Sequence, residues 1–262
     1  MPGWLLSRPA AIVVAHPDDE VLGVGTLLPY LRNLRAIVHA TDGAPRRGPD
    51  ASNAGASSWQ EYAALRRCEF EAVAKAAGLH SSELIRLDYA DQEASLHLPQ
   101  LARQFIRIFH QLRPRVVFTH PYEGGHPDHD ACAAAVRFAC LLLSRARRPR
   151  VLEFASYHIS PKGGLGTERF LDNSGKVWSR VLNDVQRRNK RELISCYRSQ
   201  QAVLSQFPIC QEPIRMAPDY DFTRPPHPGK LYYENFDWGV TGMQWRRLAR
   251  SAMRRLRLMP KQ

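Results

Sequence analysis

The stretch AAIVVAHPDDE at residues 10–20 decides the fold. Its first six residues are apolar and rich in valine and isoleucine, a composition typical of a β-strand. The polar turn HPDDE follows at once, and a helix-like segment interrupted by Pro29 then runs over residues 20–32, where we expect a kink or an early stop. We therefore predict that this stretch forms the first strand of a sheet and leads into its first crossover.

Further strand-like runs lie at residues 35–40, 83–87, 115–119 and, with a weaker pattern, 152–159. Helix-like segments lie at residues 60–77, 98–112, 127–145 and 184–206. Alternation of strands with helices favours a parallel sheet covered on both faces. The sequence thus predicts a single α/β domain with a Rossmann-like, doubly wound and mostly parallel sheet.

Length and composition are those of a folded protein. The chain has 262 residues, of which 44% are hydrophobic and 24% charged, so it can bury a core without disulfides. The apolar runs fall far short of the roughly 20 residues that cross a bilayer, and the N-terminus lacks the basic start of a secretory signal. We therefore expect a cytoplasmic location. The five cysteines form no CxxC pair, which argues against a zinc ribbon.

Two polar clusters follow the first and fourth predicted strands: HPDDE at residues 16–20 and HPDHD at residues 126–130. In a doubly wound sheet these strands commonly flank the point where strand order reverses, and ligands bind in the crevice there. Imidazole and carboxylate groups bind zinc, and a catalytic zinc site uses three protein ligands. His16, Asp19 and His129 could supply them.

The other polar residues of the clusters suit acid and base work; they are Asp18, His126 and Asp128. Each cluster alone has a simpler interpretation, since histidines in polar turns are usually solvated and carboxylates before a helix often only cap it. Two HPD-containing loops after two sheet strands favour the metal site instead. His120 and His158 also lie near strand ends and could line the pocket.

The two motifs, AHPDDE at residues 15–20 and GHPDHD at residues 125–130, resemble those of the LmbE/PIG-L family of zinc-dependent N-deacetylases. Weaker matches extend the resemblance to Arg66, Glu69 and Asp91 and to the segment KRELISCYRSQ at residues 190–200. The resemblance implies a Zn²⁺ enzyme that removes the acetyl group from an N-acetylglucosamine-type sugar or its conjugate, releasing acetate and a free amine.

The resemblance also implies a role for each site residue. It implies that His16, Asp19 and His129 are the zinc ligands and that Asp18 is the general base. It implies that His126 assists the oxyanion and the leaving amine and that Asp128 orients a histidine. Arg66 and Asp91 would contact the sugar. Some relatives carry a Tyr or Arg just before the second motif, where this chain has Gly124 and Gly125, so that such a role is missing here or falls to Tyr122 or Glu123. Zinc hydrolysis of another acyl amide, or a basic binding protein that kept the fold without turnover, remain the alternatives.

The net charge of +12 is concentrated near the C-terminus, where residues 243–262 contain seven basic residues and no acidic one. We therefore divide the chain into a deacetylase domain at residues 1–242 and a basic amphipathic helix at residues 243–262. The helix either docks on the body or attaches to an anionic surface, such as the inner face of a membrane or an acidic glycan. No nucleic-acid-binding motif is evident, so we expect no nucleic-acid partner.

Overall fold

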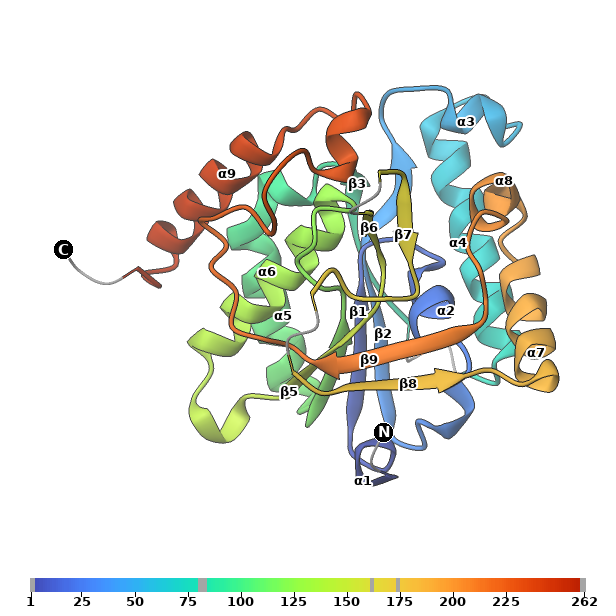
Figure 1. Ribbon diagram of the computed structural model, residues 1–262, viewed down its shortest axis with the longest axis horizontal. Helices are drawn as coiled ribbons and strands as arrows, with labels where there is room; N and C mark the ends of the chain where they lie inside the picture. Colours follow the sequence, from blue (N-terminus) through green and yellow to red (C-terminus); the bar gives the residue numbers. More distant parts are fainter. Residues whose placement is uncertain (1–2, 80–83, 161–162, 173–174, 260–262) are drawn as a thin grey trace.

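The structure, a computed structural model, describes residues 3–79, 84–160, 163–172 and 175–259. A seven-stranded sheet in the order β3-β2-β1-β4-β5-β9-β8 runs through its centre (Figure 1). The parallel strands are β1 (Ala10–Val14), β2 (Leu34–Pro45), β3 (Leu84–Asp91), β4 (Val116–Thr119) and β5 (Arg150–Phe154). Two antiparallel strands, β9 (Gln211–Met216) and β8 (Val177–Val181), complete one edge. Strand order reverses between β1 and β4, which confirms the predicted fold.

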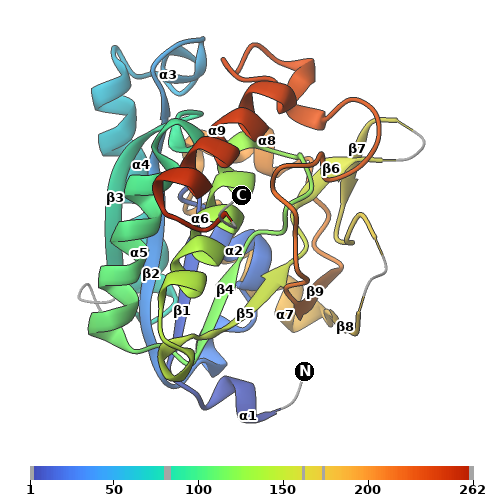
Figure 2. The same cartoon turned by 90° about the vertical axis from the view of Figure 1, so that its left-hand side faces the viewer.

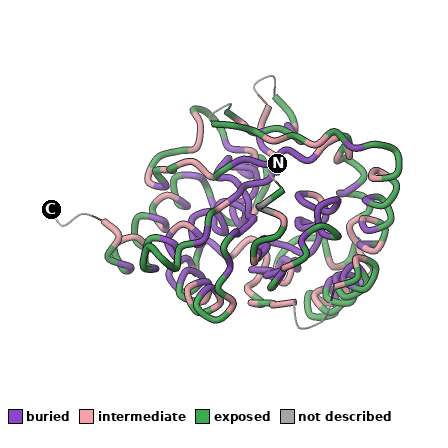
Figure 3. Tube along the Cα trace, turned by 90° about the horizontal axis from the view of Figure 1, so that it is seen from below, coloured by how far each residue is buried: buried purple, intermediate pink, exposed green. Residues whose placement is uncertain are grey.

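Helices cover both faces of the sheet, as Figure 2 shows from the side. One layer contains α2 (Asp19–Val24), α4 (Trp59–Ala76) and α7 (Asp184–Ser195), and the other contains α5 (Leu98–Leu112), α6 (Pro127–Leu142) and α9 (Gly242–Arg255). Side chains alternate along a strand, so Ile12 and Val14 pack in the first layer while Ala11 and Val13 pack in the second. Among the described residues, the buried side chains therefore form two large cores, one on each side of the sheet, and a small third cluster at Ala44, Ala56 and Tyr62. Figure 3 colours the chain by burial.

Short elements connect this framework. They are α1 (Gly3–Leu6), η1 (Leu28–Tyr30), α3 (Asp50–Asn53), η3 (Ala94–His97), η4 (Arg145–Arg147), β6 (Tyr157–Ile159), β7 (Leu165–Thr167), η5 (Arg198–Gln200), α8 (Gln201–Leu204) and η6 (Tyr232–Asn235). The break at Pro29 is confirmed, because α2 stops at Val24 and Pro29 lies in η1.

Two predicted elements are divided in the structure. The run at residues 152–159 leaves the sheet after Phe154, and its second half, β6, pairs with β7 in a separate two-stranded sheet. The helix predicted at residues 184–206 ends at Ser195, because Tyr197 and Ser199 are held by hydrogen bonds to the distant carboxylates Glu20 and Glu69. The helix predicted at residues 127–145 ends early, at Leu142.

The C-terminal helix α9 packs against α5 and α6. Trp245, Ala249 and Ala252 of its apolar face are buried while Leu248 and Met253 are partly buried, and the indole Nε1 of Trp245 donates to the carbonyl of Pro127 at 3.0 Å. Its arginines at positions 247, 250 and 254 are exposed. This packing is that of a terminal helix docked on the body of the protein. Residues 260–262 of the predicted tail lie outside the described residues, as does Glu83 of the third predicted strand. Within the described part of the chain, none of the helices combines the length and apolarity that spanning a membrane requires.

Candidate metal centre and active site

The two HPD-containing loops meet where β1 and β4 end, and Asp19 joins them. One carboxylate oxygen of Asp19, Oδ2, lies 3.2 Å from Nδ1 of His16, and the other, Oδ1, lies 3.2 Å from Nε2 of His129. Asp19 begins α2, whereas His129 lies in the first turn of α6, which Pro127 opens. All three side chains are buried. The topology thus brings together the residues that the spacing of the motifs singled out.

Buried imidazole and carboxylate donors of this kind suit a divalent metal. Three combinations of ligand atoms each lie within 4.8 Å of one another: His16 with His126 and His129; Asp19 with His120 and His129; and His16 with Asp91, His126 and Asp128. None of these three combinations contains all three predicted ligands, because His16 and His129 occur together in one and Asp19 and His129 in another. The Nδ1 atom of His129 is buried without a hydrogen-bond partner among the described residues, so one ring nitrogen of that histidine is left uncommitted.

His120, which directly follows β4, lies in the centre of the cluster. Its ring stacks on that of His129 with centroids 3.9 Å apart, and its Nε2 lies 3.4 Å from Oδ2 of Asp19. The same Nε2 accepts the backbone N–H of Ala15 at 3.1 Å. Burial, together with the charge of His129, lowers the pKa of His120 to about 3. This histidine is therefore neutral, and it ties the end of β1 to the end of β4.

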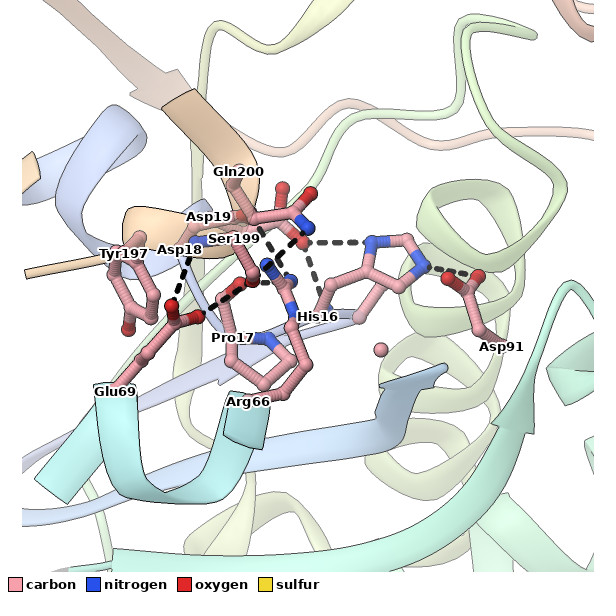
Figure 4. Close-up of polar contacts among 12 residues, drawn as sticks. His16, Pro17, Asp18, Asp19, Arg66, Glu69, Asp91, Tyr197, Ser199 and Gln200 are labelled. Atoms are coloured by element: carbon pink, nitrogen blue, oxygen red, sulfur yellow. Dashed lines mark hydrogen bonds and ion pairs between the residues drawn. The ribbon is translucent and has the colours of Figure 1, made fainter. Parts of the chain in front are cut away.

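Asp18 occupies a strained position beside Asp19, with φ at 117°. The guanidinium of Arg66, from α4, donates to its Oδ2 at 3.1 Å and also to the carbonyl of Pro17 (Figure 4). The backbone N–H of Asp18 donates to Glu20. Burial raises the pKa of Asp18 to about 7, against the opposing charge of Arg66. Arg66, which the resemblance assigned to the sugar, thus holds Asp18 in place.

A buried hydrogen-bond network around Glu20 holds the turn that contains Asp18 and Asp19. The Oε1 oxygen of the Glu20 carboxylate accepts a hydrogen bond from the hydroxyl of Tyr197, and its Oε2 oxygen lies 3.1 Å from Nε2 of His39. All three side chains are completely buried. A nearby carboxylate, that of Glu69, accepts both the backbone N–H and the hydroxyl of Ser199 at 2.7 Å (Figure 4). The segment at residues 190–200 therefore supports the site without lying among the candidate metal ligands.

Asp128 and Asp91 act on the far side of His16. Nε2 of His16 lies 3.0 Å from Oδ1 of Asp91 and 3.4 Å from Oδ2 of Asp128. Asp128 is fixed by the backbone N–H groups of Gln92, at 2.6 Å, and Ala94, at 3.0 Å. Burial alone would lower the pKa of His16, but the charge of Asp91 and hydrogen bonds to the surrounding carboxylates raise it well above its usual value. Asp128 therefore lies within reach of His16, in the kind of position that the family resemblance implies for a residue that orients a histidine.

His126 caps the N-terminus of α6 and faces the same space. Its Nδ1 accepts the backbone N–H of Asp128 at 3.2 Å, which leaves the proton of the neutral ring on Nε2. Burial, reinforced by the charge of His16, lowers its pKa well below the usual value. Its ring lies 4.5 Å from those of both His16 and Trp238. His126 is thus a neutral donor beside the candidate metal ligands.

The residues before the second motif make contacts away from the site, which favours the alternative that such a role is missing over a role for Tyr122 or Glu123. The Tyr122 hydroxyl donates to the carbonyl of Arg224, and the Glu123 carboxylate accepts from the backbone of Leu171. Tyr157 lies in the site instead, with its ring 5.1 Å from that of His129. The sequence carried no local signal for Tyr157, since it lies in the short strand β6.

An open cavity enclosing about 710 Å³ of empty space lies over this cluster. Its floor includes His16, Asp18, Asp19, Arg66, Asp91, His126 and His129, so it collects seven of the eight predicted site residues. Tyr62, Gln200 and Trp238, which the sequence did not single out, also line it. A narrow second pocket reaches Asp19 and His129 from the side of Phe154. His158 lines neither cavity.

A buried set of imidazole and carboxylate donors at the point where the strand order of a doubly wound sheet reverses is typical of a metal-dependent enzyme. Comparison with known proteins agrees. Residues 11–140 match the model of the PIG-L family, described as GlcNAc-PI de-N-acetylase, and this part of the chain belongs to that family. The family resemblance expected from the two motifs is confirmed.

Two relatives are named as probable N-acetyl-alpha-D-glucosaminyl L-malate deacetylase 2. The one from Bacillus anthracis is 28% identical over 156 residues, which cover 58% of this chain and 68% of the relative. The one from Bacillus subtilis is 27% identical over 150 residues, which cover 54% of this chain and 64% of the relative. The matched stretch thus spans about two thirds of each.

Solved structures share the fold. A deacetylase of the teicoplanin biosynthesis pathway, in a complex named deacetylase-bog, aligns with a TM-score of 0.60 and 16% identity over 80% of this chain and 99% of that one. The N,N'-diacetylchitobiose deacetylase of Pyrococcus horikoshii aligns with a TM-score of 0.54 and 22% identity over 80% of this chain and 84% of that one. At these identities the likeness concerns the fold.

Proposed function

We propose that this protein is a hydrolytic N-deacetylase that removes the acetyl group from an N-acetylglucosamine-type sugar or its conjugate, releasing acetate and a free amine. The observation that carries the proposal is the contact of Asp19 with both His16 and His129, with the Arg66-bound Asp18 directly beside it. The relatives named as N-acetylglucosaminyl malate deacetylases and the diacetylchitobiose deacetylase support the substrate class.

In this proposal His16, Asp19 and His129 hold one Zn²⁺ ion. The donor set is one that zinc prefers, and one of the similar structures is described as a zinc-inhibited form of teicoplanin deacetylase. When bound, the ion activates a water molecule for attack on the amide and polarises the amide carbonyl. Asp128 and Asp91 fix the His16 ring from its other nitrogen, which is how outer carboxylates commonly orient a ligating histidine.

The protein's own residues divide the proton transfers. Asp18 takes the proton of the attacking water, because its carboxylate lies next to Asp19 and is aimed by Arg66. The Nε2–H of His126 would donate a hydrogen bond to the oxyanion on the carbonyl oxygen, and the proton that Asp18 has taken from the water would pass to the leaving amine. The sugar ring binds on the polar floor beside Asp91, while Arg66 is engaged with Asp18.

The test is a mass-spectrometric screen of N-acetylglucosamine conjugates for the loss of an acetyl group, run with and without a chelator. We expect at least one conjugate to lose its acetyl group, chelation to abolish the reaction, and zinc to restore it. Retention of the acetyl group by every conjugate, with zinc bound, would favour the non-catalytic binding protein. Release from unrelated acyl amides alone would favour the other alternative.

A further inference from the structure

The cavity over the candidate metal centre differs in chemistry between its floor and its mouth. The floor is formed by the buried histidines and carboxylates of the two motifs. Of the lining residues, only Asp50 and Val203 are exposed, and Val203 retains 51% of its surface. Phe207 and Trp238, both partly buried, add further apolar surface to the lining, and these two residues together with Val203 are called the apolar wall. A group that extends from a sugar on the floor toward solvent therefore passes this wall.

The mouth offers no cation to an acidic group. Among the described residues that line the cavity, Arg66 alone is an arginine or lysine. It is only 2% exposed, and its Nη2 is bound to Asp18 and to the carbonyl of Pro17, so its charge belongs to the floor rather than the mouth. Arg46, nearby in the chain, is turned onto the ring of Trp59, 3.7 Å from its centroid, and pairs with Asp42. The exposed charge at the mouth is instead the carboxylate of Asp50. An acidic aglycone would meet a like charge there, which costs affinity.

The apolar wall is held in place by its surroundings. The ring of Trp238 is stacked on that of Phe236 at 4.5 Å, and it contacts His126 at the same centroid distance. These aromatic residues, like Val203 and Phe207, lie beyond residue 140, where the family match ends. The wall is thus contributed by a part of the chain outside the family match, where differences in substrate between relatives are expected.

We propose that the site selects amino-sugar conjugates whose aglycone is uncharged and presents an apolar face, and discriminates against acidic aglycones such as malate. The inference rests on the proposed function, because it takes the sugar to lie on the cavity floor. An apolar ring against Val203, Phe207 and Trp238 gains affinity by removing apolar surface from water. An acidic aglycone gains no paired cation and faces Asp50.

The experiment measures dissociation constants by calorimetry for three α-glycosides of glucosamine, carrying phenyl, methyl or L-malate as the aglycone. These are products of the proposed reaction, so they cannot turn over. We expect the phenyl glycoside to bind at least tenfold more tightly than the malate glycoside. Val203→Ser should weaken phenyl binding roughly three- to tenfold while leaving methyl binding unchanged. Asp50→Lys should strengthen malate binding and so reduce the ratio between the dissociation constants of the malate and phenyl glycosides.

Val185→Ser is the matched control, because Val185 in α7 is 53% exposed and lines neither cavity at the site. It should change none of the three constants. Malate binding as tight as phenyl binding, or equal effects of the two valine substitutions, would overturn the inference. Acetate release from the acetylated glycosides is measured separately. Its absence would refute the proposed deacetylation, whereas the order of the dissociation constants still reports on the mouth of the cavity.

Discussion

Replacing Trp245 with alanine should destabilise the entire domain, because this residue joins α9 to the helix that carries His129. The Trp245 side chain is completely buried, its ring lies 5.2 Å from that of Tyr122, and its indole N–H bonds the carbonyl of Pro127. Truncation of a buried tryptophan to alanine costs about 3–5 kcal/mol. The lost hydrogen bond from the indole N–H adds about 1 kcal/mol. The expected loss of about 4–6 kcal/mol is a large fraction of the stability of a typical domain.

Urea unfolding followed by tryptophan fluorescence and by circular dichroism measures this loss. Arg247→Ala is the control, because Arg247 lies in the same helix but is exposed, and the substitution should change the free energy of unfolding by no more than about 0.5 kcal/mol. A Trp245→Ala cost below about 1.5 kcal/mol would refute the reasoning. It would mean that α9 is only loosely attached and that residues 243–262 form the separable unit predicted from charge.

Three further substitutions test the site and its support. Arg66→Met should lower kcat at least about 100-fold with little change in KM, because Arg66 holds the carboxylate of Asp18 in position. A change confined to KM would instead support a contact between Arg66 and the sugar. Asp128→Ala should cost about 2–4 kcal/mol in urea unfolding, because two buried backbone N–H groups lose their acceptor; a loss below 1 kcal/mol would contradict this. Burial raises the pKa of Glu153 to about 8, so the folded protein holds a proton there that the unfolded chain releases, and stability falls as pH rises from about 4.5 to 8. Glu153→Gln should reduce that slope by up to about 1.4 kcal/mol per pH unit, and an unchanged slope would show that Glu153 is already ionised.

The sheet centre and the metal-site residues could be predicted because their signals are local. The strand β1 is a continuous apolar run, and the polar residues of the HPD-containing loops follow strands whose carboxyl ends meet at one edge. The edge strand β9 was missed because its buried residues include Glu212 and Arg215, which are satisfied by distant partners, Lys190 and Glu153. No alternation of apolar residues marks such a strand.

The cavity walls were missed for a related reason. Tyr157, Gln200 and Trp238 come from separate short segments, and only the folded chain brings them together. Arg66 was found through family resemblance, but its contact with Asp18 depends on how α4 packs against the turn after β1. Position along the chain predicted which residues lie near the site, whereas their individual roles required the geometry.

In the proposed mechanism the adjacent carboxylates divide two tasks, metal binding by Asp19 and proton transfer by Asp18. This division is tested by measuring zinc content and single-turnover acetate release together for Asp18→Asn and Asp19→Ala. We expect Asp18→Asn to keep its zinc while its rate falls about 10²- to 10⁴-fold, and Asp19→Ala to lose zinc. Loss of zinc from Asp18→Asn together with full zinc in Asp19→Ala would contradict it.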